Sequence, residues 1–290
     1  MLTALALCRF LHFAAAMLLF GASAFVWALA PPELTRLLMR PLRTTIAAAI
    51  VVAAITALAW VGLEAAQMGE GWGDAVDPRV LADVLADTAF GGVWLWRLAL
   101  ALILLGALAF GRHDRLTFIV PAAALFLASL GLVGHATMQS GLIGALHRLN
   151  HGAHLLAAGA WLGGLLPFIL CLRLGDDPRL RLEVATALRR FSGAGHFVVA
   201  LIVATGIVNT MLTLVAWPID FSSLYQALLA AKLAVVAAMI AMALFNRYVL
   251  APRVGNPAAL RALTINSAAE LALGAGALAL VSVFGILAPV

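Results

Sequence analysis

A chain of 290 residues that is 64% hydrophobic and only 11% charged does not have the composition of a soluble globular domain. Such domains are roughly half apolar and about a quarter charged. The net charge of +5 comes mainly from arginines in short segments between hydrophobic runs. That pattern is typical of membrane topology signals and does not indicate nucleic-acid binding.

Apolar runs of membrane-spanning length recur along the whole chain, and each could cross a bilayer as an α-helix. Strand-like alternation is absent, which argues against a β-barrel. We therefore predict an all-α, polytopic membrane helix bundle with eight transmembrane helices, forming one integral membrane domain over residues 1–290. The predicted spans are approximately 4–30, 44–66, 91–111, 116–135, 147–172, 191–216, 226–249 and 262–288.

Arginines are distributed unequally between the two sets of connecting loops. Thirteen lie in the loops after the first, third, fifth and seventh spans, whereas only Arg79 and Arg148 lie in the opposite loops. Because basic loops stay cytoplasmic, both termini are predicted to be outside, which is the periplasm in a Gram-negative host. Cys8 and Cys171 would then lie on opposite sides of the membrane, so no disulfide is expected between them.

The longest outer loop, at about 67–90, is acidic and is predicted to contain a short helix. Asp77 can cap a short helix, Pro78 suits its first turn, and Gly91 can end it. The acidic side chains could attract cations or dock a basic carrier protein. Alternatively, this segment is simply a solvated loop.

The stretch "HRLNHGAHLLAAGAW" places three histidines at the outer start of the fifth span. On a helix, His147, His151 and His154 share one face, and neighbouring pairs can share one metal ion. Polar groups inside a membrane are costly and tend to be functional, which favours a role for His151 and His154. His147 could equally be a surface histidine.

Further candidate ligands are predicted on the same side of the membrane. His135 and Met138 lie in "GHATMQSG", while His12 and Glu64 lie in the outer parts of the first and second spans. Imidazole nitrogen with thioether sulfur favours copper over magnesium or calcium, although Met138 could simply be a packing residue. The predicted metal site draws on His12, His135, Met138, His147, His151 and His154.

The inner half carries fewer polar residues. Glu270 is the only acid predicted at depth, and it joins His196 and Glu64 as a candidate for the transport pathway. Lys232 is the only lysine in the chain. Arg9 and Arg97 are expected to extend toward the interface, unless Arg97 pairs with an acid.

In their order along the chain, several segments resemble the CopD/PcoD family of bacterial copper-resistance inner-membrane proteins. These are "RFLHFAA", "FGGVWLWR", "GHATMQSG", "HLLAAGAWLGGLLPF", "RRFSGAGHFVVALIVATGIVNT" and "AAKLAVVAAMIAMALFNRYVLAPRV", followed by a last span with Glu270. The resemblance implies eight spans, copper handling across the inner membrane and a separate periplasmic copper-binding partner of the CopC type. His135 and His154 fit the recurrent histidine positions of the family best.

The leading hypothesis is a multi-pass inner-membrane protein, not an enzyme, that carries Cu(I) or Cu(II) from the periplasm toward the cytoplasm. The absence of a P-loop motif argues against ATP-driven pumping by this chain. One alternative is a b-type haem electron-transfer protein that uses histidines such as His12, His135, His154 and His196 as axial ligands. Another is an accessory protein that holds copper without moving it.

Overall fold

The computed structural model describes residues 1–109, 115–175, 177–214 and 221–289, and the secondary structure in these ranges is helical throughout. Eight helices in the described ranges are long and apolar enough to cross a membrane, as predicted. In chain order these membrane-length helices occupy Leu2–Leu29, Pro32–Met68, Ala89–Ala109, Arg115–Leu132, Gly141–Leu174, Arg181–Thr213, Leu224–Arg253 and Pro257–Phe284.

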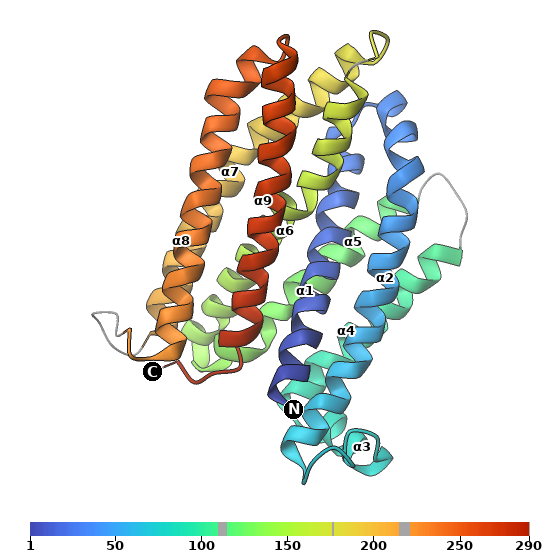
Figure 1. Ribbon diagram of the computed structural model, residues 1–290. Coiled ribbons are helices and arrows are strands. Elements are labelled where there is room, and N and C mark those ends of the chain that lie inside the picture. The colour runs from blue at the N-terminus through green and yellow to red at the C-terminus, as the bar shows by residue number, and fades with distance from the viewer. Residues whose placement is uncertain (110–114, 176, 215–220, 290) are drawn as a thin grey trace.

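The helices are labelled as in Figure 1. They are α1 (Leu2–Ala24), α2 (Pro32–Met68), α3 (Pro78–Asp87), α4 (Ala89–Ala109), α5 (Arg115–Ala128), α6 (Gly141–Leu174), α7 (Arg181–Thr213), α8 (Leu224–Phe245) and α9 (Pro257–Phe284). Short π- or 3₁₀-helical turns extend α1, α5 and α8: η1 (Phe25–Leu29), η2 (Ser129–Leu132), η4 (Asn246–Leu250) and η5 (Ala251–Arg253). A separate turn, η3 (Gly134–Thr137), connects η2 to α6.

Several helices begin earlier than their apolar segments predict. Helix α2 starts at Pro32 and not near residue 44, and α7 starts at Arg181 and not near residue 191. The reason is that arginine is a good helix former, so basic turns continue a helix beyond the hydrocarbon region. Hydrophobicity therefore located the membrane-embedded part of each helix and missed its ends. The predicted ends of the third and sixth spans, at 111 and 216, lie outside the described residues.

The short helix predicted in the acidic loop is confirmed as α3. The Asp77 carboxylate caps it by accepting a hydrogen bond from the backbone N–H of Arg79 at 2.8 Å, and Pro78 occupies its first turn. The expectation that Gly91 ends this helix is wrong, because α3 ends at Asp87 and Gly91 lies within α4. A Cβ atom at Gly91 would lie 2.2 Å from the carbonyl oxygen of Val84, so glycine permits the close approach of α3 and α4.

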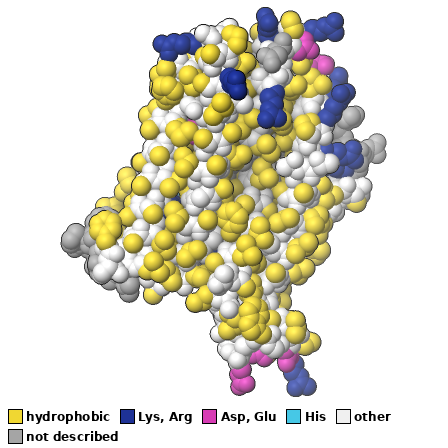
Figure 2. Space-filling model, in the orientation of Figure 1, with side chains coloured by type: hydrophobic (Ala, Val, Ile, Leu, Met, Phe, Trp, Pro, Cys, Tyr) yellow, Lys and Arg dark blue, Asp and Glu magenta, His cyan; other side chains and the backbone are white. Residues whose placement is uncertain are grey.

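Both ends of the chain lie at the same end of the bundle, together with α3 (Figure 1). We call this the termini end. Basic side chains gather at the opposite end, whereas acidic side chains are prominent around α3 (Figure 2). We call the basic end the arginine end. This asymmetry is the one that the charge distribution of the loops predicted.

Helices α1 and α6 cross at the centre of the bundle through glycines. A Cβ atom at Gly21 would lie 2.1 Å from the oxygen of Gly159, and one at Gly163 would lie 2.2 Å from the oxygen of Met17. Small residues of this kind allow membrane helices to pack backbone to backbone. By contrast, α7 packs chiefly on α6 and α8 packs chiefly on α9. This arrangement leaves room between the two helix pairs for the cavities described next.

Candidate functional site

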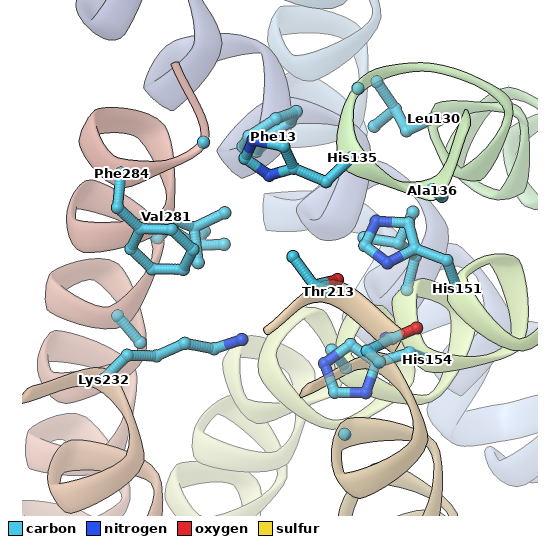
Figure 3. Close-up of a pocket in the computed structure, with 18 of the residues that line it drawn as sticks. Phe13, Leu130, His135, Ala136, His151, His154, Thr213, Lys232, Val281 and Phe284 are labelled. Carbon is cyan, nitrogen blue, oxygen red and sulfur yellow. The ribbon is translucent and has the colours of Figure 1, made fainter. Parts of the chain in front are cut away.

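One large cavity opens among α1, α6, α7, α8, α9 and η3 at the termini end and has a volume of about 890 Å³. Four of the predicted ligands line it: His135, His147, His151 and His154. We call it the histidine cavity. Its charged lining residues are Arg9, Glu64 and Lys232. Figure 3 shows His151 and His154 on one side of this cavity, with Lys232 and Phe284 on the other.

His135 reaches the cavity because the chain leaves helical geometry after α5. The 3₁₀ turn η2 follows Ala128, and Gly134 then adopts a left-handed φ of +73° that re-aims the chain into η3. The His135 Nε2–H group donates to the carbonyl oxygen of Leu287 at 3.0 Å. This tautomer leaves the Nδ1 lone pair available in the cavity. Burial and the charge of Arg9 lower the pKa of His135, although the hydrogen bond to Leu287 partly opposes that shift.

Hydrogen bonds orient His154 and His147 of α6. The partner of His154 is Thr205 of α7, and the partner of His147 is Gln139, which precedes α6. The Thr205 hydroxyl donates to the oxygen of Leu201 at 2.5 Å, so it accepts from Nδ1–H of His154 at 2.9 Å. In the same way, the Gln139 amide donates to the oxygen of Leu212 at 2.6 Å and accepts from His147 Nδ1–H at 2.7 Å.

The imidazoles of His147 and His154 therefore each keep an Nε2 lone pair, which is the arrangement that a metal-ligating histidine needs. The ring of His151 stacks near that of His154, with ring centroids 6.4 Å apart.

The methionines that line the histidine cavity are not the one that the sequence predicted. Met138 is 50% exposed and does not line the histidine cavity, whereas Met17, Met211 and Met239 do. For Met17 a signal existed, because Arg9, Phe13 and Met17 recur every four residues on one face of α1. In the described residues, no group of three or more His, Cys, Asp or Glu side chains is close enough to hold a metal ion together.

His12 lies outside the histidine cavity, in a buried cluster with Arg97. The Thr56 hydroxyl donates to the oxygen of Val52 at 2.7 Å and accepts from His12 Nδ1 at 2.8 Å. The other ring nitrogen of His12 accepts from Arg97. Both ring nitrogens are thus engaged within the protein, and the expected convergence of His12 with His135 and His154 on one ion is not observed.

The expectation that Arg97 extends to the interface or pairs with an acid is wrong. Its side chain is fully buried and its Nη1 group donates to the oxygen of Phe126 at 2.7 Å and to the hydroxyl of Ser129 at 2.6 Å. These acceptors lie where α5 gives way to η2. Arg97 therefore stabilises the break in the helix that leads to His135. Arg9 also does not extend outward: its guanidinium lies over the Trp60 ring at 5.2 Å.

A second cavity, of about 1170 Å³, lies toward the arginine end and is lined by Glu270. We call it the glutamate cavity. Glu270 is only 2% exposed, and its Oε1 accepts a hydrogen bond from Asn246 Nδ2 at 2.6 Å. His196 lines the same cavity but is exposed, with its Nε2 3.0 Å from the Tyr248 hydroxyl.

Among the described residues, two line both cavities: Trp161 of α6 and Ile240 of α8. The histidine cavity reaches toward the termini end and the glutamate cavity toward the arginine end, so the two follow one another through the bundle. We call this pair of residues, Trp161 and Ile240, the partition. An ion that crossed the protein through these cavities would pass this partition.

Comparison with protein families gives two matches along the chain. The family model described as "Copper resistance protein D-like, N-terminal domain" matches residues 1–145. The family model described as "Copper resistance protein D" matches residues 185–284. The first match includes α1 to α5, and the second includes most of α7 and the whole of α8 and α9.

Three curated proteins are similar to this chain. Inner membrane protein YebZ of Escherichia coli (strain K12) is 38% identical over 285 residues, which are 97% of each chain. Copper resistance protein D of Pseudomonas syringae pv. tomato is 28% identical over 97% of this chain and 95% of its own. Copper transport protein CutJ of Bacillus subtilis (strain 168) is 29% identical over 50% of this chain and 28% of its own length.

No solved structure matches the chain significantly. None of the names of the similar proteins mentions haem, so the comparisons give no support to the haem-binding alternative.

Proposed function

Because the chain belongs to the copper resistance protein D family, we propose that it moves copper through the inner membrane by way of the two successive cavities. It is a multi-pass membrane protein with eight helices of membrane-spanning length in its described part. The observation that carries the proposal is the set of four histidines in a cavity that abuts a second, glutamate-lined cavity.

Copper would bind first in the histidine cavity. His135, His147 and His154 each keep one imidazole lone pair after their hydrogen bonds are counted, and imidazole is a good copper ligand. Met17 and Met211 add thioether sulfur, which favours the cuprous ion. Since no three His, Cys, Asp or Glu side chains of the described residues converge on one point, we propose transient coordination by pairs of histidines, such as His151 with His154. Weak binding by successive pairs suits an ion that must leave again.

Glu270 would receive the ion beyond the partition. It is the acid in the glutamate cavity, and a buried carboxylate within a membrane bundle commonly marks an ion or proton pathway. Glu64 would act at the entrance, where its Oε1 accepts a hydrogen bond from Trp60 at 2.9 Å. His196 would lie at the exit of the glutamate cavity.

The direction of transport follows from the proposed orientation. Basic loops favour the cytoplasmic side, so the arginine end would face the cytoplasm and the termini end the periplasm. Copper would then enter from the periplasm, delivered by a separate copper-binding protein of the CopC type. The acidic surface around α3 would attract the cation or its carrier.

The test is copper uptake by proteoliposomes that contain the purified protein, measured by metal content with and without a reductant. The Nε2 of His154 is proposed as a ligand, so His154→Ala should reduce uptake strongly. Met138→Leu is the matched control, because Met138 is exposed outside both cavities. Equal uptake by empty liposomes and by protein-containing liposomes would contradict transport and favour a copper-holding role.

A further inference from the structure

The histidine cavity carries an excess of positive charge, which is unexpected in a site for a cation. Arg9 and Lys232 line it, and Glu64 is the single acid among its described lining residues. Neither cation forms an ion pair within the described ranges, where Arg36 with Glu33 is the one salt bridge. Ionised side chains inside membrane proteins normally pair with one another, because an unpaired charge away from water is costly.

Groups within the protein offset only part of this charge. The guanidinium of Arg9 lies against Gly285, directly after the C-terminal end of α9, where a helix carries about half a negative charge. Its buried Nε nevertheless has no hydrogen-bond partner among the described residues. Glu64 can balance one cation at most. Among the described residues, the ammonium group of Lys232 therefore lacks a full counter-charge.

Lys232 also projects into the cavity. It lies eight residues after the start of α8, about 12 Å along the helix axis. Figure 3 shows its amine directed into the cavity, toward the side where His154 lies. The Nζ atom is 6.0 Å from the centre of the Phe284 ring, a weak contact that leaves its hydrogen-bond donors free to meet a ligand.

We infer that the histidine cavity contains an anion-binding subsite in which the ammonium group of Lys232 holds a small anionic group, with Arg9 adding to the positive potential. A halide, a small carboxylate or the phosphate of a lipid headgroup has the required chemistry. If copper is carried as proposed above, this anion would lie beside the metal ion at His154 and reduce its repulsion from Lys232. The anion site itself does not depend on that proposal.

The inference is tested on the purified, copper-free protein in a neutral detergent by titrating sodium chloride and following thermal unfolding. Wild type and Lys232→Arg should show a saturable rise of about 2–4 °C in the midpoint, because a bound ligand stabilises the folded state. Lys232→Met has a side chain of similar length without the charge, and it should show no saturable rise.

Arg79→Met is the matched control, since Arg79 is an exposed cation on α3 outside the cavity, and it should respond like wild type. A second titration, with phosphatidylglycerol in place of chloride, distinguishes the source of the anion. A rise that depends on Lys232 with the lipid alone would assign the subsite to a headgroup phosphate. Equal responses of Lys232→Met and wild type to both probes, or no response of wild type to either, would overturn the inference. No copper is present, so failure of the transport proposal would not change this result.

Discussion

Trp161 of α6 and Ile240 of α8 line both the histidine cavity and the glutamate cavity. Glu270 of α9 lines the glutamate cavity together with them. The two shared residues thus lie where the cavities meet. The partition is therefore the place at which passage of an ion through the bundle would be controlled.

Removal of the indole ring should connect the two cavities. In a protein whose two native cysteines are replaced, Ser267→Cys provides a thiol in the glutamate cavity. A membrane-impermeant thiol reagent added at the termini end should label it in Trp161→Ala and not in wild type. Trp161→Phe keeps an aromatic ring without the N–H donor and should stay unlabelled. Equal labelling of all three proteins would show that Trp161 is not the barrier.

Glu270→Gln should fold normally and transport copper poorly. The glutamine amide oxygen can still accept the hydrogen bond from Asn246, so the contact between η4 and α9 is kept. The negative charge is lost, and with it the attraction for a cation in the glutamate cavity. We expect an uptake rate lower by at least about tenfold, which corresponds to about 1.4 kcal/mol, with an unchanged melting temperature. Normal uptake would assign Glu270 a purely structural role.

The orientation of the bundle can be tested separately from transport. A C-terminal fluorescent reporter that matures only in the cytoplasm should stay dark, because the arginine end is expected to face the cytoplasm. An enzymatic reporter that is active only in the periplasm should be active at the same position. The opposite pair of results would reverse the proposed direction of copper entry.

The sequence was sufficient to predict the eight spans, because each apolar run has membrane-spanning length. It also placed His135 and His154 at the same end of the bundle, where both line the histidine cavity, while their role as ligands stays a prediction. The position of His12 could not be predicted, because its partners Thr56 and Arg97 lie 44 and 85 residues away in the chain. The position of Trp161 between the two cavities likewise depends on how α6, α8 and α9 pack together, and the local sequence around Trp161 does not predict this packing.

Stability should depend on pH through His135. Burial and the charge of Arg9 lower the pKa of this residue in the folded protein. As the pH falls below about 6.5, the unfolded chain takes up a proton before the folded chain does, so folding stability decreases. His135→Gln can still donate to the oxygen of Leu287, because its amide reaches the position of the imidazole Nε2, but it does not titrate. Between pH 7.5 and 5.5 the melting temperature of this variant should fall less than that of wild type. An equal fall would show that His135 is not the group responsible.

His12→Ala and His154→Ala should have opposite effects. His12 is fully buried, and its loss leaves Thr56 and Arg97 without their partner and opens a cavity beside Trp60 and Phe126. An unpaired buried polar group costs about 1–3 kcal/mol. We therefore expect a large fall in the melting temperature of His12→Ala, with copper binding per folded molecule retained.

His154→Ala should instead keep most of its stability and lose copper binding, because its Nε2 is proposed as a ligand and its surroundings already form a cavity. The measurement is copper stoichiometry after gel filtration, performed together with thermal unfolding of the same samples. If His12→Ala lost copper binding but kept full stability, His12 would have to be assigned to the metal site. Full copper binding by His154→Ala would remove the histidine cavity from the proposed pathway.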